Sequence, residues 1–207
     1  MNERQSGRFR LQSELYRFPY HYTPHFDRHG VATRARTLEW GLEYLCYQQE
    51  ILRLVQESSP GSVLEVGCGD GVFLNALTGV PKRIGVDLDE RAIGFARAFS
   101  TGAEFRAEDV ARIEEKFDVV VAIEVLEHVP DSVVPSFIAA VVERVRPGGQ
   151  LILSVPTTVL PLNPKHYRHY DESRLEAELR DATDELVDLE FFRFYREPWW
   201  LRVYLKA

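Results

Sequence analysis

The chain has 207 residues, of which 45% are hydrophobic and 28% charged, and its formal net charge is −7 at pH 7. This composition is typical of one globular domain and excludes a disordered, collagen-like or coiled-coil protein. The longest aliphatic run, Val119–Ile123, is far shorter than a membrane helix, and the polar N-terminus lacks the apolar core of a secretory signal. Two cysteines, Cys46 and Cys68, cannot form a disulfide framework, so we predict a reduced, cytoplasmic protein.

Residues 1–37 differ from the rest of the chain in charge and in aromatic content. They contain seven arginines and three acidic residues, a net charge of +4, which leaves −11 for residues 38–207. Six aromatic rings fall in the same stretch without a helical or strand period, so we expect an irregular segment. Two interpretations stay open: the rings cover the core, or the segment forms a lid on the substrate side of a ligand site.

Regular elements begin at residue 38. Thr37 is a candidate N-cap, and an apolar stripe through Val55 predicts a helix that ends at the turn 58–61. Short apolar runs then alternate with helical patterns, which predicts a parallel sheet with helices on both faces. The predicted strands are 62–67, 83–87, 103–105, 117–123 and 150–155. The predicted helices between them are 72–79, 89–100 and 132–146.

The C-terminal part has a different pattern. Residues 186–195 and 199–206 are two strand-like runs separated by Arg196-Glu197-Pro198, which predicts an antiparallel hairpin at the sheet edge. No internal repeat or linker is found, so residues 38–207 are assigned to one domain. The fold class expected is therefore α/β, a doubly wound, Rossmann-like and mostly parallel sheet.

A glycine-rich turn, VLEVGCGDG at 63–71, follows the first strand directly. Glycines at this position let the backbone approach a ligand closely. The spacing is G-x-G-x-G, so it matches neither the G-x-G-x-x-G dinucleotide fingerprint nor the phosphate loop of ATP-binding proteins. Taken alone, the turn is equally typical of a tight connection between a strand and a helix.

Acidic residues at the ends of later strands make the pattern more specific. Asp87 ends the second strand, where a carboxylate can accept both hydroxyls of a ribose. Asp109 follows the third strand, where it can accept from an adenine amino group beside the Val110 amide. Glu124 ends the fourth strand. Because ligands bind at the carboxyl ends of strands in open α/β sheets, these residues predict one shared site.

The series VLEVGCGDG, GVDLDE, FDVVVAIEVLEHVPD and RPGGQLILSVP resembles the class I S-adenosylmethionine-dependent methyltransferases. The resemblance covers residues 37–207 and implies a seven-stranded sheet with one antiparallel strand from the hairpin. It implies S-adenosylmethionine as cofactor, whose positive charge suits an acidic lining. The residues that it assigns to the cofactor are Glu65, Gly67, Cys68, Gly69, Asp87, Leu88, Asp109, Val110 and Glu124.

Methyl transfer from an activated sulfonium depends mainly on positioning, and a base helps when the acceptor is a hydroxyl or a protonated amine. The candidate catalytic residues are Glu124, His128, His166 and His169. We expect transfer without a metal. The alternative is a divalent metal held by Glu124, Glu127, His128 and His169, with His169 preferred to His166 as the fourth ligand. The Glu-x-x-Glu-His arrangement with a later histidine resembles the small-RNA 3′-end 2′-O-methyltransferases. The Glu-x-x-Glu-His part also resembles the ubiquinone-pathway O-methyltransferases.

Three functions remain open from the sequence. The first is methyl transfer to an oxygen or nitrogen of a small-molecule metabolite by a monomer or homodimer, and it is the function we favour. The second is methylation of RNA or protein, with the basic residues of 1–37 guiding an acidic substrate. The third is a nonenzymatic S-adenosylmethionine-binding protein. The acidic net charge makes a nucleic-acid partner the less favoured one but does not exclude it, because the basic stretch can receive an anion.

Overall fold

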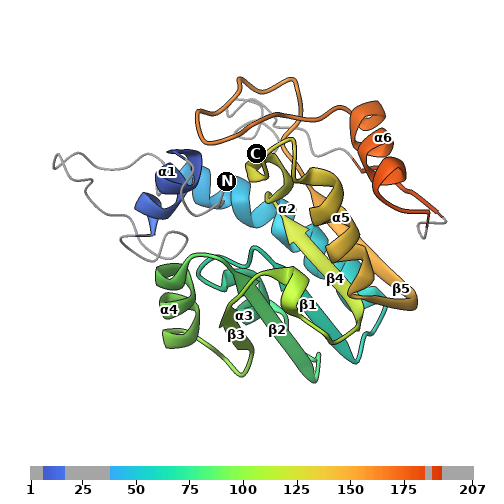
Figure 1. The fold of residues 1–207 in the computed structure, drawn as a ribbon. Coiled ribbons are helices and arrows are strands. Elements are labelled where there is room, and N and C mark those ends of the chain that lie inside the picture. The colour runs from blue at the N-terminus through green and yellow to red at the C-terminus, as the bar shows by residue number, and fades with distance from the viewer. Residues whose placement is uncertain (1–6, 17–37, 185–187, 193–207) are drawn as a thin grey trace, which may run out of the picture.

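The computed structural model describes residues 7–16, 38–184 and 188–192. In these residues the chain forms one five-stranded sheet in the order β3-β2-β1-β4-β5, and every neighbouring pair is parallel (Figure 1). The strands are β1 (Ser62–Val66), β2 (Lys82–Asp87), β3 (Glu104–Ala107), β4 (Phe117–Ile123) and β5 (Val145–Ser154). The helices are α1 (Gly7–Leu15), α2 (Leu38–Glu57), α3 (Val72–Ala76), α4 (Glu90–Ala98), α5 (Val134–Glu143) and α6 (Glu172–Ala182), with 3₁₀ turns η3 (Val110–Arg112) and η4 (Leu126–His128).

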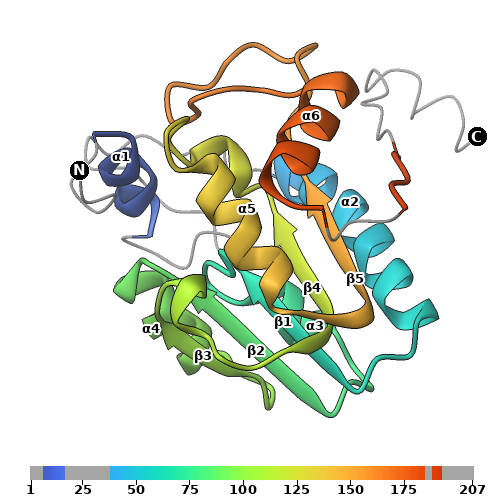
Figure 2. The same ribbon diagram turned by 45° about the vertical axis from the view of Figure 1, so that its right-hand side comes forward.

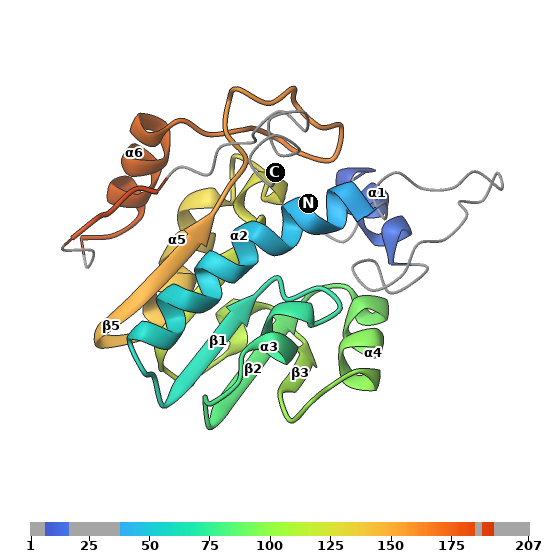
Figure 3. The ribbon, with the colours of Figure 1, turned by 180° about the vertical axis from the view of Figure 1, so that it is seen from behind.

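Helices cover both faces of the sheet, as the continuous apolar runs of its central strands predict. In β4, Val119 and Val121 pack on one face with side chains of α2, α3 and α4, which lie on the near side in Figure 3. Val120 and Ala122 pack on the opposite face with α5 and η3, which Figure 2 shows in front of the sheet. A third cluster joins η4, α5 and α6. The predicted α/β, doubly wound arrangement is confirmed.

The predicted number of strands is wrong for the described part of the chain, where the sheet has five parallel strands instead of seven strands with an antiparallel hairpin. Residues 188–192, inside the first predicted hairpin strand, form no strand. Phe191 and Phe192 there have 37% and 56% of their surface exposed. Aromatic residues favour a strand only when they have a sheet surface to pack on, and these two pair with none of the described strands. The rest of the hairpin lies outside the described residues.

The N-terminal segment also differs from the prediction. Residues 1–37 were expected to be irregular, but Gly7–Leu15 form α1. This helix has no buried residue of its own, and Tyr16 directly after it is only 5% exposed. Because α1 lacks an apolar stripe, its sequence gives no helical period to detect. The remaining residues of 1–37, with Thr37 and its predicted cap, lie outside the described part.

The strand order creates a switch point between β1 and β4, where the connections leave toward opposite faces of the sheet. The loops that follow these two strands touch: a Cβ atom on Gly67 would lie 2.5 Å from a methyl group of Val125. Ligands of open α/β sheets bind at such a point. No helix within the described ranges is long and apolar enough to cross a membrane.

Candidate active site

The turn after β1 requires glycine because three of its residues have positive φ. The angle is 71° at Gly67, 54° at Gly69 and 80° at Gly71, in a region that other residues seldom adopt. The Gly67 and Cys68 amides donate hydrogen bonds to the Val86 carbonyl at 2.8 and 3.1 Å. The turn is therefore held against the end of β2, beside Asp87.

Asp87 is fixed by two backbone amides. The Gly69 amide donates to its Oδ2 at 2.9 Å, and the Asp89 amide donates to its Oδ1 at 2.8 Å. Burial nevertheless raises the pKa of Asp87 to about 6, against the opposing effect of these two hydrogen bonds. The side chain is a rigid, half-buried acceptor at the carboxyl end of β2.

Glu65 lies beneath the same turn and is almost fully buried, with 4% of its surface exposed. Burial raises the pKa of Glu65 well above its ordinary value, and the nearby Asp87 and Asp70 raise it further. Its Oε2 atom has no hydrogen-bond partner among the described residues. A buried carboxylate of this kind is costly unless a cation or a donor reaches it. Cys68, also buried, lies in the same turn.

The other residues predicted to bind the cofactor lie at the ends of β2 and β3. Leu88 is half-buried directly after Asp87. Asp109 is exposed and caps η3, because its Oδ1 accepts from the Ala111 amide at 2.9 Å. Val110 is buried in the core cluster on the α5 face. The cap fixes the side chain of Asp109 at the end of β3, and its predicted role toward an adenine stays a prediction.

The end of β4 has an unusual backbone at Glu124, whose φ is 55°. The Glu124 amide donates to the Ser154 carbonyl at 3.0 Å, and the Ser154 hydroxyl donates to Glu124 Oε1 at 3.0 Å. These bonds hold Glu124 against β5. The chain then turns through η4, which directs Glu127 into the interior, where it has no exposed surface.

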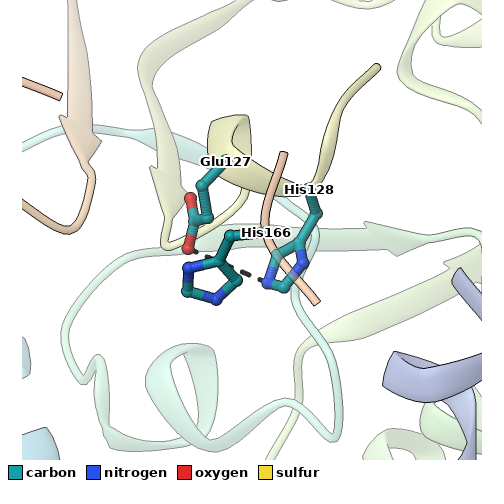
Figure 4. A group of neighbouring side chains, drawn as sticks. All are labelled: Glu127, His128 and His166. Carbon is teal, nitrogen blue, oxygen red and sulfur yellow. Dashed lines mark ion pairs between the residues drawn. The ribbon is translucent and has the colours of Figure 1, made fainter. Parts of the chain in front are cut away.

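Glu127, His128 and His166 form one cluster, shown in Figure 4. Each side chain offers an oxygen or nitrogen atom, and these atoms lie within 4.8 Å of one another. His128 Nε2 lies 3.8 Å from Glu127 Oε1, and the two imidazole centroids are 4.7 Å apart. Neither carboxylate oxygen of Glu127 has a hydrogen-bond partner within the described part of the chain.

The protonation of this cluster follows from its burial. Burial raises the pKa of Glu127 well above its ordinary value, and the neighbouring Glu124 raises it further. Burial lowers the pKa of His128 to about 4 and that of His166 to about 3, with a smaller contribution from the positive charge of Lys165. Both imidazoles are therefore neutral near pH 7 and keep a nitrogen lone pair.

Arg168 joins the segment after β5 to the end of β4. Its guanidinium is buried and donates to the carbonyls of Leu126 at 2.9 Å and Val129 at 2.5 Å. The Tyr167 amide also donates to the Glu127 carbonyl at 2.8 Å. These bonds bring His166 to η4. Arg168 and Lys165 are not among the residues predicted from the sequence, although both stand beside His166 and His169 in the chain.

The structure brings His166, rather than His169, to Glu127 and His128. His169 contacts His166 instead. Its Nε2 atom is 2.8 Å from His166 Nδ1, and its Nδ1 atom is 3.1 Å from the Leu160 carbonyl. Glu124 also lies outside the three-residue cluster. The alternative metal set of the sequence analysis therefore shares two residues, Glu127 and His128, with the observed cluster.

Helix α1 reaches both halves of the site. At its start the Arg8 guanidinium lies 4.6 Å from the centroid of the Tyr167 ring. After its end, the Tyr16 hydroxyl lies so close to Gly69 that a Cβ there would be 2.5 Å away. The helix therefore spans from the glycine turn to the segment that carries His166.

A doubly wound sheet with a glycine turn after β1 and fixed carboxylates after β2 and β4 defines the class of α/β proteins that bind a nucleotide-like ligand at the switch point. A family model described as a methyltransferase domain matches residues 34–200. The chain belongs to this methyltransferase domain family.

Relatives agree with this assignment. A probable S-adenosylmethionine-dependent methyltransferase of Mycolicibacterium smegmatis is 31% identical over 147 residues, covering 66% of this chain and 56% of the relative. A ubiquinone biosynthesis O-methyltransferase of Thiobacillus denitrificans is 38% identical, covering 56% of this chain and 53% of the relative. The chain thus spans about half the length of these two curated relatives.

A solved structure supports the fold. The N-methyltransferase NodS of Bradyrhizobium japonicum WM9, in complex with S-adenosyl-l-homocysteine, is 27% identical with a TM-score of 0.50, covering 55% of this chain and 62% of that chain. A second structure of NodS gives a TM-score of 0.55 at 26% identity and covers 66% of this chain and 80% of that one.

Proposed function

We propose that the protein transfers a methyl group from S-adenosylmethionine to an oxygen or nitrogen atom of a small molecule. The observation that carries this proposal is the buried Glu65, with its unpartnered oxygen, beside the fixed Asp87 under a glycine turn at the switch point. Relatives named for O- and N-methyl transfer support it.

The residues at the switch point suit this cofactor chemically. S-adenosylmethionine carries a positive sulfonium and a positive amino group, and the acidic turn supplies Glu65 as a buried counter-charge. Asp87 is held in place to accept from ribose hydroxyls, and the glycine backbone permits close approach. When bound, the cofactor supplies an activated methyl group.

The chain's own part in the reaction is to position the acceptor and to manage its proton. Glu124 and Glu127 come from the end of β4, the strand next to the cofactor turn, so they line the acceptor side. Burial raises the pKa of Glu124 toward neutrality, which suits a general base. His128 and His166 are weak bases because their pKa values are lowered, so they serve better as hydrogen-bond acceptors for a hydroxyl.

A metal-assisted form of the reaction is a second candidate, and the unpartnered carboxylate of Glu127 favours it. A buried carboxylate and two neutral imidazoles are suitable ligands for a divalent ion such as Zn²⁺ or Mn²⁺. Glu127, His128 and His166 would hold it, and Glu124 would add negative charge nearby. Such an ion lowers the pKa of a hydroxyl acceptor.

Calorimetry with S-adenosylhomocysteine tests the cofactor assignment. We expect the wild type to bind, and Glu65→Gln to bind at least about tenfold more weakly, because the neutral amide loses the counter-charge. Glu114→Gln changes an exposed glutamate and is the matched control. A wild type that does not bind would overturn the proposal.

The acceptor class has its own test. Tritiated S-adenosylmethionine is supplied with a panel of phenols, catechols and amines, and separately with total RNA. We expect label in the small-molecule products. Label confined to RNA would replace this proposal with the RNA-modifying alternative, and chelation by EDTA in the active reaction would separate the metal-assisted form from the metal-free one.

A further inference from the structure

We propose that His169 is a positioning residue that fixes the tautomer of His166. The inference rests on the proposed function only in placing His166 at the acceptor side of the site. The geometry itself is a chain of two hydrogen bonds that starts at a backbone carbonyl and ends on the His166 ring.

The first link of the chain is the Leu160 carbonyl, which can only accept a hydrogen bond. It lies 3.1 Å from His169 Nδ1, so that nitrogen must carry the proton. In a neutral imidazole the other nitrogen is then unprotonated and is an acceptor. The hydrogen bond from His169 Nδ1 to the Leu160 carbonyl therefore leaves His169 Nε2 as a hydrogen-bond acceptor.

The second hydrogen bond of the chain determines the tautomer of His166. His169 Nε2 lies 2.8 Å from His166 Nδ1, a short hydrogen bond that requires the proton on Nδ1. The His166 Nε2 atom is then the only ring nitrogen of that residue with a free lone pair. It is the atom through which His166, a member of the cluster with Glu127 and His128, can then accept a proton or bind a cation.

Burial makes the arrangement persistent. His166 and His169 have 9% and 8% of their surface exposed, so water competes little for these bonds. The segment that carries them is held by Arg168, which donates to the Leu126 and Val129 carbonyls. Hydrogen bonds to the second nitrogen of a functional imidazole determine the orientation of its ring. Their loss commonly lowers activity or metal affinity by about 10–100-fold.

Two-bond ¹H–¹⁵N spectra of histidine side chains at pH 8 test the proposal directly. In the wild type we expect His166 to be protonated at Nδ1, its signal being assigned by its loss in His166→Asn. In His169→Phe the acceptor is removed, so we expect His166 to move toward the Nε2-protonated tautomer. His169→Gln supplies a side-chain oxygen as acceptor and is expected to restore the first tautomer.

His128 is an internal control in the same spectra, because its Nδ1 lies 3.4 Å from the Lys165 carbonyl, a backbone neighbour that His169→Phe leaves in place. Its tautomer is expected to stay unchanged in His169→Phe. A wild-type His166 protonated at Nε2, or an unchanged His166 in a folded His169→Phe protein, would overturn the proposal. If His169→Phe does not fold, the wild-type spectrum alone decides.

The rate of methyl transfer adds a functional readout. We expect His169→Phe to reduce the methyl-transfer rate by about 10–100-fold, with rescue by His169→Gln. The two proposals fail separately: an inactive protein with the expected tautomers contradicts only the methyltransferase proposal. An active protein with full activity in His169→Phe contradicts the positioning role.

Discussion

Glu65 and Glu127 are buried carboxylates, one in each half of the site. Each has at least one oxygen without a hydrogen-bond partner among the described residues. Burying a polar group without a partner costs free energy of folding. Retaining two such groups at a switch point is expected where a bound cation or donor completes them, because active sites trade stability for function.

Replacing Glu127 tests whether its buried carboxyl lowers the stability of the folded protein. We expect Glu127→Met to stabilise the protein in EDTA by about 1–2 kcal/mol, which corresponds to a rise in Tm of about 3–6 °C. The reason is that an apolar side chain of similar size removes a buried, unpartnered carboxyl. Calorimetric melting measures the change. Glu114→Met on the surface should stay within about 0.5 kcal/mol. A lower Tm for Glu127→Met would show that the carboxyl is satisfied in the folded protein.

Asp87 predicts a pH dependence of cofactor binding. Its pKa in the folded protein is about 6, above the ordinary 3.8. A raised pKa means that Asp87 stabilises the free protein most below pH 4 and that this contribution is lost as the pH rises through 6. Cofactor binding needs the opposite state, since only the carboxylate accepts from both ribose hydroxyls.

We therefore expect the affinity for S-adenosylhomocysteine to fall as the pH drops below about 6, by up to about tenfold per pH unit. In Asp87→Asn the affinity should be lower at pH 7.5 and nearly constant down to pH 5. Binding titrations between pH 5 and 8 measure both proteins. The same slope in both would assign the titration to another group.

At the scale of elements, the site depends on how the segment after β5 is attached to η4. Arg168 is nearly fully buried and forms hydrogen bonds to two carbonyls around η4, to the Tyr170 hydroxyl at 3.2 Å and to Asp131 at 2.7 Å. Thr157 and Tyr170 form an isolated bridge that closes the same loop. The loop therefore has a fixed path over the end of β4.

Arg168→Met is expected to destabilise the protein by about 3–5 kcal/mol, because it leaves the Leu126 and Val129 carbonyls without their donor. Hydrogen exchange should accelerate in residues 156–170 before it does so in the sheet. Thermal melting and exchange mass spectrometry measure the two effects. Arg180→Met on the exposed side of α6 is the control, with an expected change below about 0.5 kcal/mol. Equal effects of the two variants would contradict the role of Arg168.

At the scale of the whole molecule, charge is divided between a basic N-terminal stretch and an acidic remainder. Helix α1 places part of that stretch over the switch point, through Arg8 at Tyr167 and Tyr16 at Gly69. We infer that residues 7–16 belong to a lid that covers the cofactor turn and the acceptor side together, with Arg8 over Tyr167 on the acceptor side.

The double variant Arg8→Ala/Tyr16→Ala removes the contacts with Tyr167 and with Gly69 and tests the lid. We expect affinity for S-adenosylhomocysteine to fall by about tenfold, since the turn loses its cover. Arg10→Ala/Leu11→Ala changes two exposed residues of the same helix and is the matched control. Calorimetry measures all three proteins. Unchanged or tighter binding in the first variant would contradict a lid.

The sequence alone determined the five parallel strands and the residues at their carboxyl ends. The physical reason is that apolar runs, glycine turns and the acidic residues after them are local features, so Asp87 and Glu124 are placed by the strands that they end. The short helix α1 escaped detection because it lacks a periodic apolar face, and the aromatic residues of 188–192 suggested a strand without a sheet surface to support it.

Only the tertiary structure decided which histidine joins Glu127 and His128. His166 and His169 are three residues apart in an irregular segment, and nothing in their spacing distinguishes a side chain in the cluster from one behind it. The path of that segment is fixed by Arg168 and the Tyr167 amide, which bond to a loop about 40 residues away. Contacts of this range depend on the folded path of the backbone, so His166 takes the inner position and His169 the supporting one.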